Sequence, residues 1–190
     1  MRGALRAALA ACLLMMMPGL LPAQASARRG VWLGLGLGHG SAQLTCAICA
    51  GGRDGGLSGF VRCGVALSPR LLIGAEVLGW RRHEGGGDYT LTSAQGLLVL
   101  YPWRTRALHF STGAGLARYT AQDTDNEIST QAFAMQVGAG WDVPVRRGIS
   151  VTPFVNFVAT TGADVKVNST ASSLSANSSL IQFGLGVTLH

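Results

Sequence analysis

The sequence is poor in charge, and beyond its first 21 residues it has no long run of apolar residues. Only 13% of its 190 residues are charged, although 48% are hydrophobic. A helix that crosses a bilayer needs roughly 20 consecutive apolar residues, so no spanning helix is expected after residue 21. The hydrophobic residues instead alternate with small or polar ones along short segments. This pattern argues against a helical membrane protein and favours β-strands.

The motifs of several enzyme classes are also absent. The chain has no phosphate-binding loop or dinucleotide fingerprint, and HEGGG at 83–87 lacks the second histidine of a zinc protease. Basic residues outnumber acidic ones by 15 to 9, a balance that often indicates nucleic-acid binding. The arginines, however, lie in separate clusters near residues 70, 104–106 and 146–147. We therefore expect no nucleic-acid partner, and we also expect no cofactor and no bound metal.

The first 27 residues have the organisation of a secretory signal peptide. Arg2 and Arg6 precede an apolar run over 7–21, and PAQASA offers small-x-small cleavage sites that end at Ala25 or Ala27. A lipoprotein cleavage box at Cys12 is the alternative, although it would leave only a short apolar core before the cut. We expect an exported chain with a single domain over 28–190.

Alternation and turn signals predict eight strands. In VWLGLGLGHG at 31–40, large aliphatic residues occupy one face and, after Trp32, glycine occupies the other. Because glycine is a poor strand former, its repetition suggests a cramped interior such as that of a small closed barrel. Similar alternation recurs at 57–67, 71–82, 89–101, 108–120, 131–143, 149–160 and 180–190. In 89–101 neither face is wholly apolar, which suggests a bulge.

The connections between these strands alternate in length. Short turns are expected at 68–70, 102–106 and 144–148, and polar, mostly longer loops at 41–56, 83–88, 121–130 and 161–179. Strands of about ten residues joined in this rhythm are typical of membrane barrels. We predict an all-β fold, an eight-stranded antiparallel up-and-down transmembrane β-barrel, whose termini and short turns face the periplasm. A secreted sandwich or lipocalin-like barrel is the alternative.

Aromatic residues lie near the ends of the predicted strands. We interpret them as girdles at the two membrane interfaces. They are Trp32, Trp80, Tyr89, Tyr101, Trp103, Tyr119 and Trp141.

The mature chain resembles the small outer-membrane β-barrel family of OmpA- and OmpX-like proteins. Its C-terminal strand at 180–190, LIQFGLGVTLH, looks like the assembly signal that the barrel-insertion machinery reads. The resemblance implies a place in the outer membrane of a Gram-negative-type bacterium. It also implies contact with outer-membrane lipids, lipopolysaccharide and the assembly machinery.

Four polar residues fall on the predicted inner face. A turn centred on Pro69 places Arg62 opposite Glu76, and a turn over 144–148 places Gln136 opposite Asn156. A charge in a narrow interior needs a partner. We therefore predict a polar network that plugs the lumen, with a switchable gate as the alternative.

The cysteines suggest chemistry in the first outer loop. Cys46 and Cys49 form a C-x-x-C, and export favours oxidation, so a disulfide or two free thiols are expected there. A metal site that includes His39 or His83 is a further alternative, although two cysteines alone under-coordinate zinc. Cys63 is expected to face lipid.

One segment favours an enzymatic alternative. LHFSTGAGL at 108–116 is similar to the His-x-Ser motif of the outer-membrane lipid A deacylases. On that resemblance His109 is the base, Ser111 the nucleophile and Asp123 or Glu127 the orienting acid. Thr112, however, replaces the family's asparagine, and the pair follows a periplasmic turn, away from lipid A.

We therefore expect a non-enzymatic barrel with a structural or adhesive role, which contacts a ligand or a surface through its outer loops. The lipid A deacylase and a narrow passive pore are the alternatives.

Overall fold

The computed structural model describes residue 28 and residues 30–46, 52–85, 87–103, 107–122, 127–167 and 170–190. These ranges contain nine β-strands, namely β1 (Gly30–Cys46), β2 (Arg53–Ser68), β3 (Leu71–Glu84), β4 (Gly87–Leu100), β5 (Leu108–Gln122), β6 (Glu127–Trp141), β7 (Val143–Arg146), β8 (Ile149–Val167) and β9 (Thr170–Leu189). The predicted signal peptide lies outside the described residues. Among those residues, no helix has the length and apolar character needed to cross a membrane.

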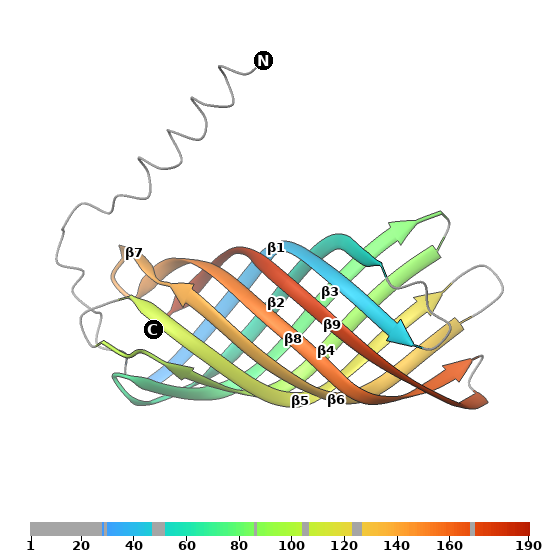
Figure 1. Ribbon diagram of the computed structural model, residues 1–190. Coiled ribbons are helices and arrows are strands. Elements are labelled where there is room, and N and C mark those ends of the chain that lie inside the picture. The colour runs from blue at the N-terminus through green and yellow to red at the C-terminus, as the bar shows by residue number, and fades with distance from the viewer. Residues whose placement is uncertain are drawn as a thin grey trace, which may run out of the picture.

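The strands close into an antiparallel barrel (Figure 1). Each strand pairs with the next from β1 to β6, and β9 returns to pair with β1 from Leu189↔Leu33 to Ala176↔Cys46. Both β6 and β7 pair with β8, so they act as one strand that is interrupted at Asp142. Counting them together gives eight strands in sequence order. The predicted up-and-down barrel is therefore confirmed.

The two ends of the barrel differ. The start of β1, the C-terminus and the turn between β7 and β8 lie at one end, here called the terminal end (Figure 1). The hairpins β1–β2, β3–β4, β5–β6 and β8–β9 lie at the opposite end, here called the loop end.

Side chains alternate between the exterior and the interior along β1. Its odd-numbered aliphatic residues are exposed, whereas Gly34 and Gly40 face inward and are buried. A Cβ on Gly34 would lie 2.7 Å from Nε of Arg62, and one on Gly40 would lie 2.6 Å from Cδ1 of Trp80. Large side chains from neighbouring strands occupy this space. The interpretation of the glycine face as a cramped interior is therefore confirmed.

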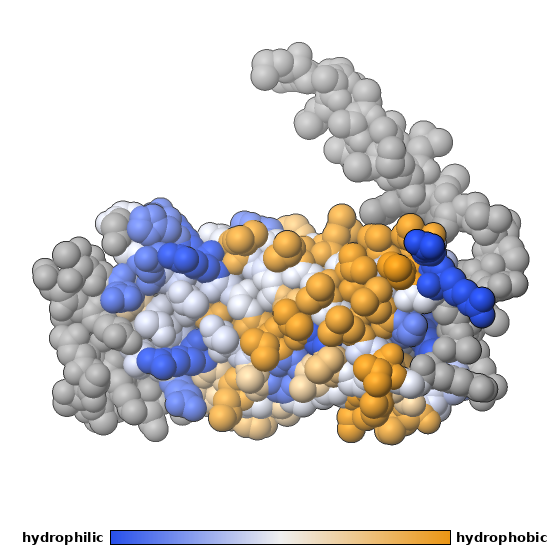
Figure 2. All heavy atoms as spheres, turned by 180° about the vertical axis from the view of Figure 1, so that it is seen from behind, coloured by the Kyte–Doolittle hydropathy of each residue, from blue (hydrophilic) through white to orange (hydrophobic). Residues whose placement is uncertain are grey.

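Exposed hydrophobic side chains form a belt around the barrel. Every strand contributes, as shown by the exposed residues Leu35, Val61, Val77, Leu98, Phe110, Val137, Val155 and Phe183. On the face shown in Figure 2 they gather in a band, with hydrophilic side chains toward both ends. Soluble monomers rarely expose apolar patches larger than a few hundred Å². A complete belt is what a barrel needs where acyl chains are the solvent.

The strands extend further at the loop end than predicted. The predicted loops 41–56, 83–88, 121–130 and 161–179 consist largely of paired strand. In the last of them, β8 and β9 stay paired as far as Val167↔Thr170. The backbone ladder continues past the point where the aliphatic alternation ends, because its hydrogen bonds do not depend on apolar side chains. Aliphatic alternation therefore indicates only the part of each strand that lies in the hydrophobic belt.

The bulge expected in 89–101 is absent, since β4 pairs with β3 and β5 without a register shift. Both of its faces are apolar near the terminal end. Leu97 and Val99 pack inside the barrel, while Leu98 and Leu100 are exposed outside. An interior with its own apolar core, and not a bulge, explains the mixed pattern.

The aromatic girdle prediction is wrong for most of its members. Trp32, Trp80, Tyr101 and Tyr119 are buried inside the barrel, and Tyr89 packs against the same interior. Trp103 and Trp141, by contrast, are exposed on the outside. A position near a strand end does not determine on which side of the wall the ring lies, because that depends on parity.

The predicted facing of Gln136 and Asn156 is also wrong. Asn156 lies opposite Gly138, and Gln136 lies opposite Val158. Residues 138 and 156 are centred on 147, one residue later than the middle of the predicted turn at 144–148. Gly148 has a φ of 74°, which glycine adopts without strain, and closes this turn. A shift of one residue in the turn moves the pairing by two.

Candidate functional site in the barrel interior

Three groups of side chains fill the barrel interior. An apolar cluster lies toward the loop end and includes Phe60, Trp80, Phe154 and Leu180. A polar group follows in the middle, and a second cluster around Tyr101 lies toward the terminal end. Phe60 and Phe154 meet edge to face with ring centroids 4.8 Å apart, a favourable geometry for aromatic rings.

The middle group contains the predicted polar residues. Arg62 on β2 lies directly opposite Glu76 on β3, and both side chains are buried. Gln95 Nε2 donates a hydrogen bond to Glu76 Oε1 at 3.4 Å and another to Gln136 Oε1. The structure thus brings Glu76 and Gln136 together through a residue that the sequence reading did not select. Inward parity on β4 is the signal that would have found Gln95.

The fourth predicted residue has a different partner. Asn156 Nδ2 donates to Gln182 Oε1 at 3.4 Å, and Gln182 comes from β9. Gln182 lies in the segment that was interpreted only as an assembly signal. Its side chain is fully buried, so this segment also contributes to the interior.

The Arg62 guanidinium lies among aromatic rings. Its Cζ is 4.6 Å from the ring centroid of Phe60 and 5.8 Å from that of Trp32. Such contacts stabilise a cation that has lost most of its water. Glu76 and Gln136 are each only 1% exposed. A water-filled channel at this level would leave them accessible, so the middle of the barrel is packed.

Asp142 is the centre of the group at the terminal end. Tyr101 donates its hydroxyl to Asp142 Oδ2 at 2.6 Å, and Thr152 donates to Oδ1 at 2.8 Å. His109 Nδ1 lies 3.7 Å from Oδ1, and His190 Nε2 lies 3.7 Å from Oδ2. All five side chains are largely or fully buried. Asp142 was not predicted, because a single carboxylate near the end of the predicted strand 131–143 forms no motif.

Both ends of the described chain reach this group. The Arg28 guanidinium carbon lies 3.6 Å from the ring centroid of Tyr101. His190 directs its side chain toward Asp142, and its backbone N–H donates to the carbonyl of Gly148 at 2.9 Å. Side chains therefore fill the barrel at the terminal end as well as in the middle.

Of the described residues of the hydrolase alternative, His109 and Ser111 lie in a different part of the barrel from Glu127. His109 and Ser111 are buried in the interior, opposite Gly140 and Gly138 of β6. Glu127 begins β6 at the loop end and cannot orient His109, which lies near the terminal end. The acid beside His109 is instead Asp142, and Asp123 lies outside the described residues.

Charged side chains gather at the loop end of β3 and β4. Asp88 Oδ1 accepts a hydrogen bond from Arg81 at 3.0 Å and lies 3.1 Å from His83 Nδ1. These hydrogen bonds, first that of Arg81 and then that of His83, lower the pKa of the Asp88 carboxyl. Arg82 forms an ion pair with Asp54 of β2, which ties the second hairpin to the first.

Of the three cysteines in the prediction, Cys63 has a described side chain. Cys63 is a free thiol on the exposed face of β2, on the side where the sequence placed it. The side chain of Cys46 and all of Cys49 lie outside the described residues, so their disulfide stays a prediction. Within the described ranges, no group of three or more His, Cys, Asp or Glu could hold a metal ion.

No family model and no curated protein matches the chain. Several solved structures do match the chain. The Neisserial surface protein A, NspA, is 14% identical with a TM-score of 0.61, and the match covers 84% of this chain and 96% of NspA. Ail, the attachment invasion locus protein of Yersinia pestis, is 9% identical with a TM-score of 0.54, and the match covers 83% of this chain and 99% of Ail.

The outer membrane protein OprG from Pseudomonas aeruginosa is 11% identical with a TM-score of 0.50, and the match covers 87% of this chain and 99% of OprG. Identities this low compare folds and not functions. The chain has the fold of the small eight-stranded outer-membrane β-barrels, the architecture that its resemblance to OmpA- and OmpX-like proteins implied.

Proposed function

We propose that this protein is a non-enzymatic outer-membrane barrel that contacts ligands or surfaces through its loop end. The packed interior is the observation that carries this proposal. Glu76, Gln136 and Gln182 are all but inaccessible, and the His109–Ser111 pair is buried. The chemistry available to a partner therefore lies at the loop end, where Arg81, His83 and Asp88 meet.

The hydrophobic belt supports an outer-membrane location with lipids and lipopolysaccharide as neighbours. The terminal end then faces the periplasm and the loop end faces outward. Segment 180–190 is the proposed recognition element for the barrel-assembly machinery. Its outward residues Phe183, Leu185 and Val187 alternate on β9, the strand that closes the barrel against β1.

An adhesive role has some support from the extended hairpins. Their paired strands continue beyond the aliphatic alternation into segments whose sequence is rich in polar residues. Ail is described as an attachment protein, and one of its structures contains the heparin analogue sucrose octasulfate. For this chain, binding to a sulfated glycan is testable by passing the folded barrel over immobilised heparin with and without competing sucrose octasulfate.

Envelope fractionation tests the location. Cells that express the chain are lysed, their membranes are separated on a density gradient, and the protein is followed by immunoblot. The protein is expected in the outer-membrane fraction and is expected to resist extraction with alkaline carbonate. Recovery in the soluble fraction would overturn the proposal.

Two further measurements separate this role from the alternatives. In planar bilayers the packed lumen is expected to give no steady conductance, whereas a pore would conduct and respond to Arg62→Ala or Glu76→Ala. Mass spectrometry of lipid A is expected to show no acyl release on expression. Loss of an acyl chain that disappears with His109→Ala or Ser111→Ala would instead establish the deacylase.

A further inference from the structure

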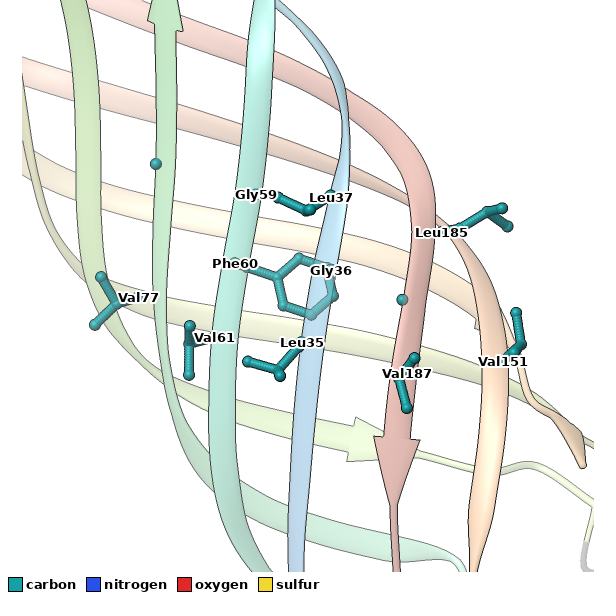
Figure 3. A pocket seen from close by; sticks show the side chains of 12 residues that line it. Leu35, Gly36, Leu37, Gly59, Phe60, Val61, Val77, Val151, Leu185 and Val187 are labelled. Carbon is teal, nitrogen blue, oxygen red and sulfur yellow. The ribbon is translucent and has the colours of Figure 1, made fainter. Parts of the chain in front are cut away.

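A depression of about 650 Å³ lies in the hydrophobic belt on the outside of the barrel. It crosses β3, β2, β1, β9 and β8 (Figure 3). In Figure 3, Val77, Val61, Leu35, Val187 and Val151 form one row across the strands, and Gly59, Leu37 and Leu185 lie in the adjacent row toward the loop end. Its size lies in the range of about 300–1,000 Å³ that is usual for small-ligand sites.

Gly79 opens one side of the depression, whereas the space beside its partner Gly59 is taken by Leu37, whose Cδ2 would lie 2.9 Å from a Cβ on Gly59. Gly59 of β2 pairs with Gly79 of β3, in an outward row where Leu37 and Leu185 are aliphatic. A Cβ on Gly79 would meet no atom within 4 Å. This differs from inward Gly34, whose missing side chain makes room for Arg62. Packing within the barrel does not explain Gly79, which instead keeps the outer surface open.

The row beyond these glycines carries basic groups. Arg81 pairs with Leu57, and Leu57 pairs with His39, so both basic residues border the depression on the side of the loop end. The Arg81 side chain is 68% exposed, and its ion pair with Asp88 lies at the surface. A guanidinium binds phosphate through two parallel hydrogen bonds, and the exposed Asp88 contact is weak enough to be exchanged for it.

We infer that the depression holds one acyl chain of a phosphorylated, acylated glycolipid of the lipid A class, with a phosphate of the same molecule on Arg81. Lipid tails solvate all apolar surfaces about equally, so an acyl chain alone gains little selectivity. The phosphate supplies this selectivity, because its negative charge complements the positive charge of Arg81. The basic edge faces the loop end, so the headgroup belongs to the outer leaflet, where such glycolipids lie. A phospholipid of the inner leaflet would place its headgroup at the opposite end.

This site depends on the outer-membrane location proposed above and gives the contact with lipopolysaccharide a definite place. The test uses the folded mature chain in detergent micelles with bisphosphorylated lipid A, and native mass spectrometry counts the lipid bound. The unaltered protein is expected to retain one lipid A. Gly79→Leu is expected to reduce retention about tenfold or more because its side chain fills the depression, and Arg81→Gln should do the same through lost charge-assisted hydrogen bonds.

Matched controls exist on the same barrel. Gly96 also faces outward, on β4, where a Cβ would meet only the carbonyl oxygen of Ala114 at 3.9 Å, so Gly96→Leu is expected to retain lipid A. Arg118 is an exposed arginine on the outward face of β5, and Arg118→Gln is expected to leave retention unchanged. Heat-modifiable gel migration confirms that each variant is folded.

Four results would overturn the inference. In the first, Gly79→Leu retains as much lipid A as the unaltered chain. In the second, phosphatidylglycerol of equal acyl length competes with lipid A equally well. In the third, dephosphorylated lipid A binds as well as the phosphorylated form. In the fourth, two copies of the chain form a dimer that covers the depression, and Gly79→Leu dissociates this dimer. None of these affects envelope fractionation, which tests the proposed location independently.

Discussion

Arg62 and Glu76 face each other across β2 and β3, and both are buried in the barrel interior. Neither charge has water to replace a lost partner. The pair is therefore a sensitive point for stability, whatever the barrel binds at its surface.

Removing either charge alone is expected to destabilise the barrel more than removing both. Arg62→Met or Glu76→Gln leaves one uncompensated buried charge, which costs about 3–5 kcal/mol. The double variant should cost less than either single variant, because it leaves no uncompensated charge. Urea unfolding from lipid vesicles, followed by tryptophan fluorescence, measures these free energies. Arg147→Met, which replaces an exposed arginine in the turn between β7 and β8, is the control and should change stability by about 0.5 kcal/mol or less. Additive single effects would show that the two charges do not interact.

Asp142 should be the most sensitive polar residue at the terminal end. Asp142→Ala removes the acceptor of both Tyr101 and Thr152. The buried Tyr101 hydroxyl then has no acceptor, whereas Thr152 can still bond to Thr188, so the expected cost is about 1–3 kcal/mol. Tyr101→Phe loses one hydrogen bond and should cost about 1 kcal/mol. Adding Tyr101→Phe to Asp142→Ala should cost little more than Asp142→Ala alone. The same unfolding assay measures all three variants, and full additivity would argue against a shared cluster.

The inward glycines should tolerate side chains much less than the outward ones. Gly40→Val would force a branched side chain against Trp80, where even a Cβ lies 2.6 Å from the indole, and overpacking costs about 1–3 kcal/mol. Gly96→Val on the outward face should fold normally. The fraction of heat-modifiable barrel after refolding compares them. Equal yields would contradict the assignment of the glycine face to a packed interior.

Asp88 should titrate below the ordinary range of an aspartate because Arg81 and His83 hold its charged form. A lowered pKa in the folded state stabilises the β3–β4 hairpin above the unfolded pKa, and this contribution is lost as the pH falls through the folded pKa. Arg81→Gln should therefore raise the pKa of Asp88, as followed by carboxyl ¹³C chemical shifts. Arg53→Gln is the control and should leave this titration unchanged. An Asp88 pKa that does not respond to Arg81→Gln would show that the hydrogen bond is not formed in solution.

Much of the fold was predictable because odd- and even-numbered residues of a barrel strand point to opposite sides of the barrel wall. The glycines of β1 face inward and Cys63 faces outward, as alternation required. The register of β2 and β3 followed from a tight turn at Pro69, which leaves little freedom in pairing. The register of β6 and β8 did not, because the pairing is centred on residue 147, one residue later than the middle of the predicted turn, and Gly148 adopts the positive φ there.

The interior was predicted less well than the wall. Alternation assigns a face but does not say which residues of distant strands meet, so Gln95, Gln182 and Asp142 were missed. Trp80 was placed in a girdle for the same reason, although it fills the lumen. The strands were predicted too short at the loop end, where the backbone pairing continues beyond the hydrophobic belt.

Acyl chains are expected to solvate the outward aliphatic face of the barrel. The free thiol of Cys63 allows a test of this expectation. Cys46 and Cys49 are replaced by serine, a nitroxide is attached to Cys63, and the barrel is reconstituted in lipid vesicles. Power-saturation spectroscopy then compares its collisions with oxygen, which concentrates in lipid, and with a water-soluble nickel chelate. A nitroxide at Arg53→Cys, in a chain that also carries Cys63→Ser, lies on the exposed side of β2 toward the loop end and reports the aqueous reference. If acyl chains surround the outward face, collisions with oxygen dominate at Cys63 and collisions with nickel dominate at position 53. Equal or greater nickel accessibility at Cys63 would contradict it.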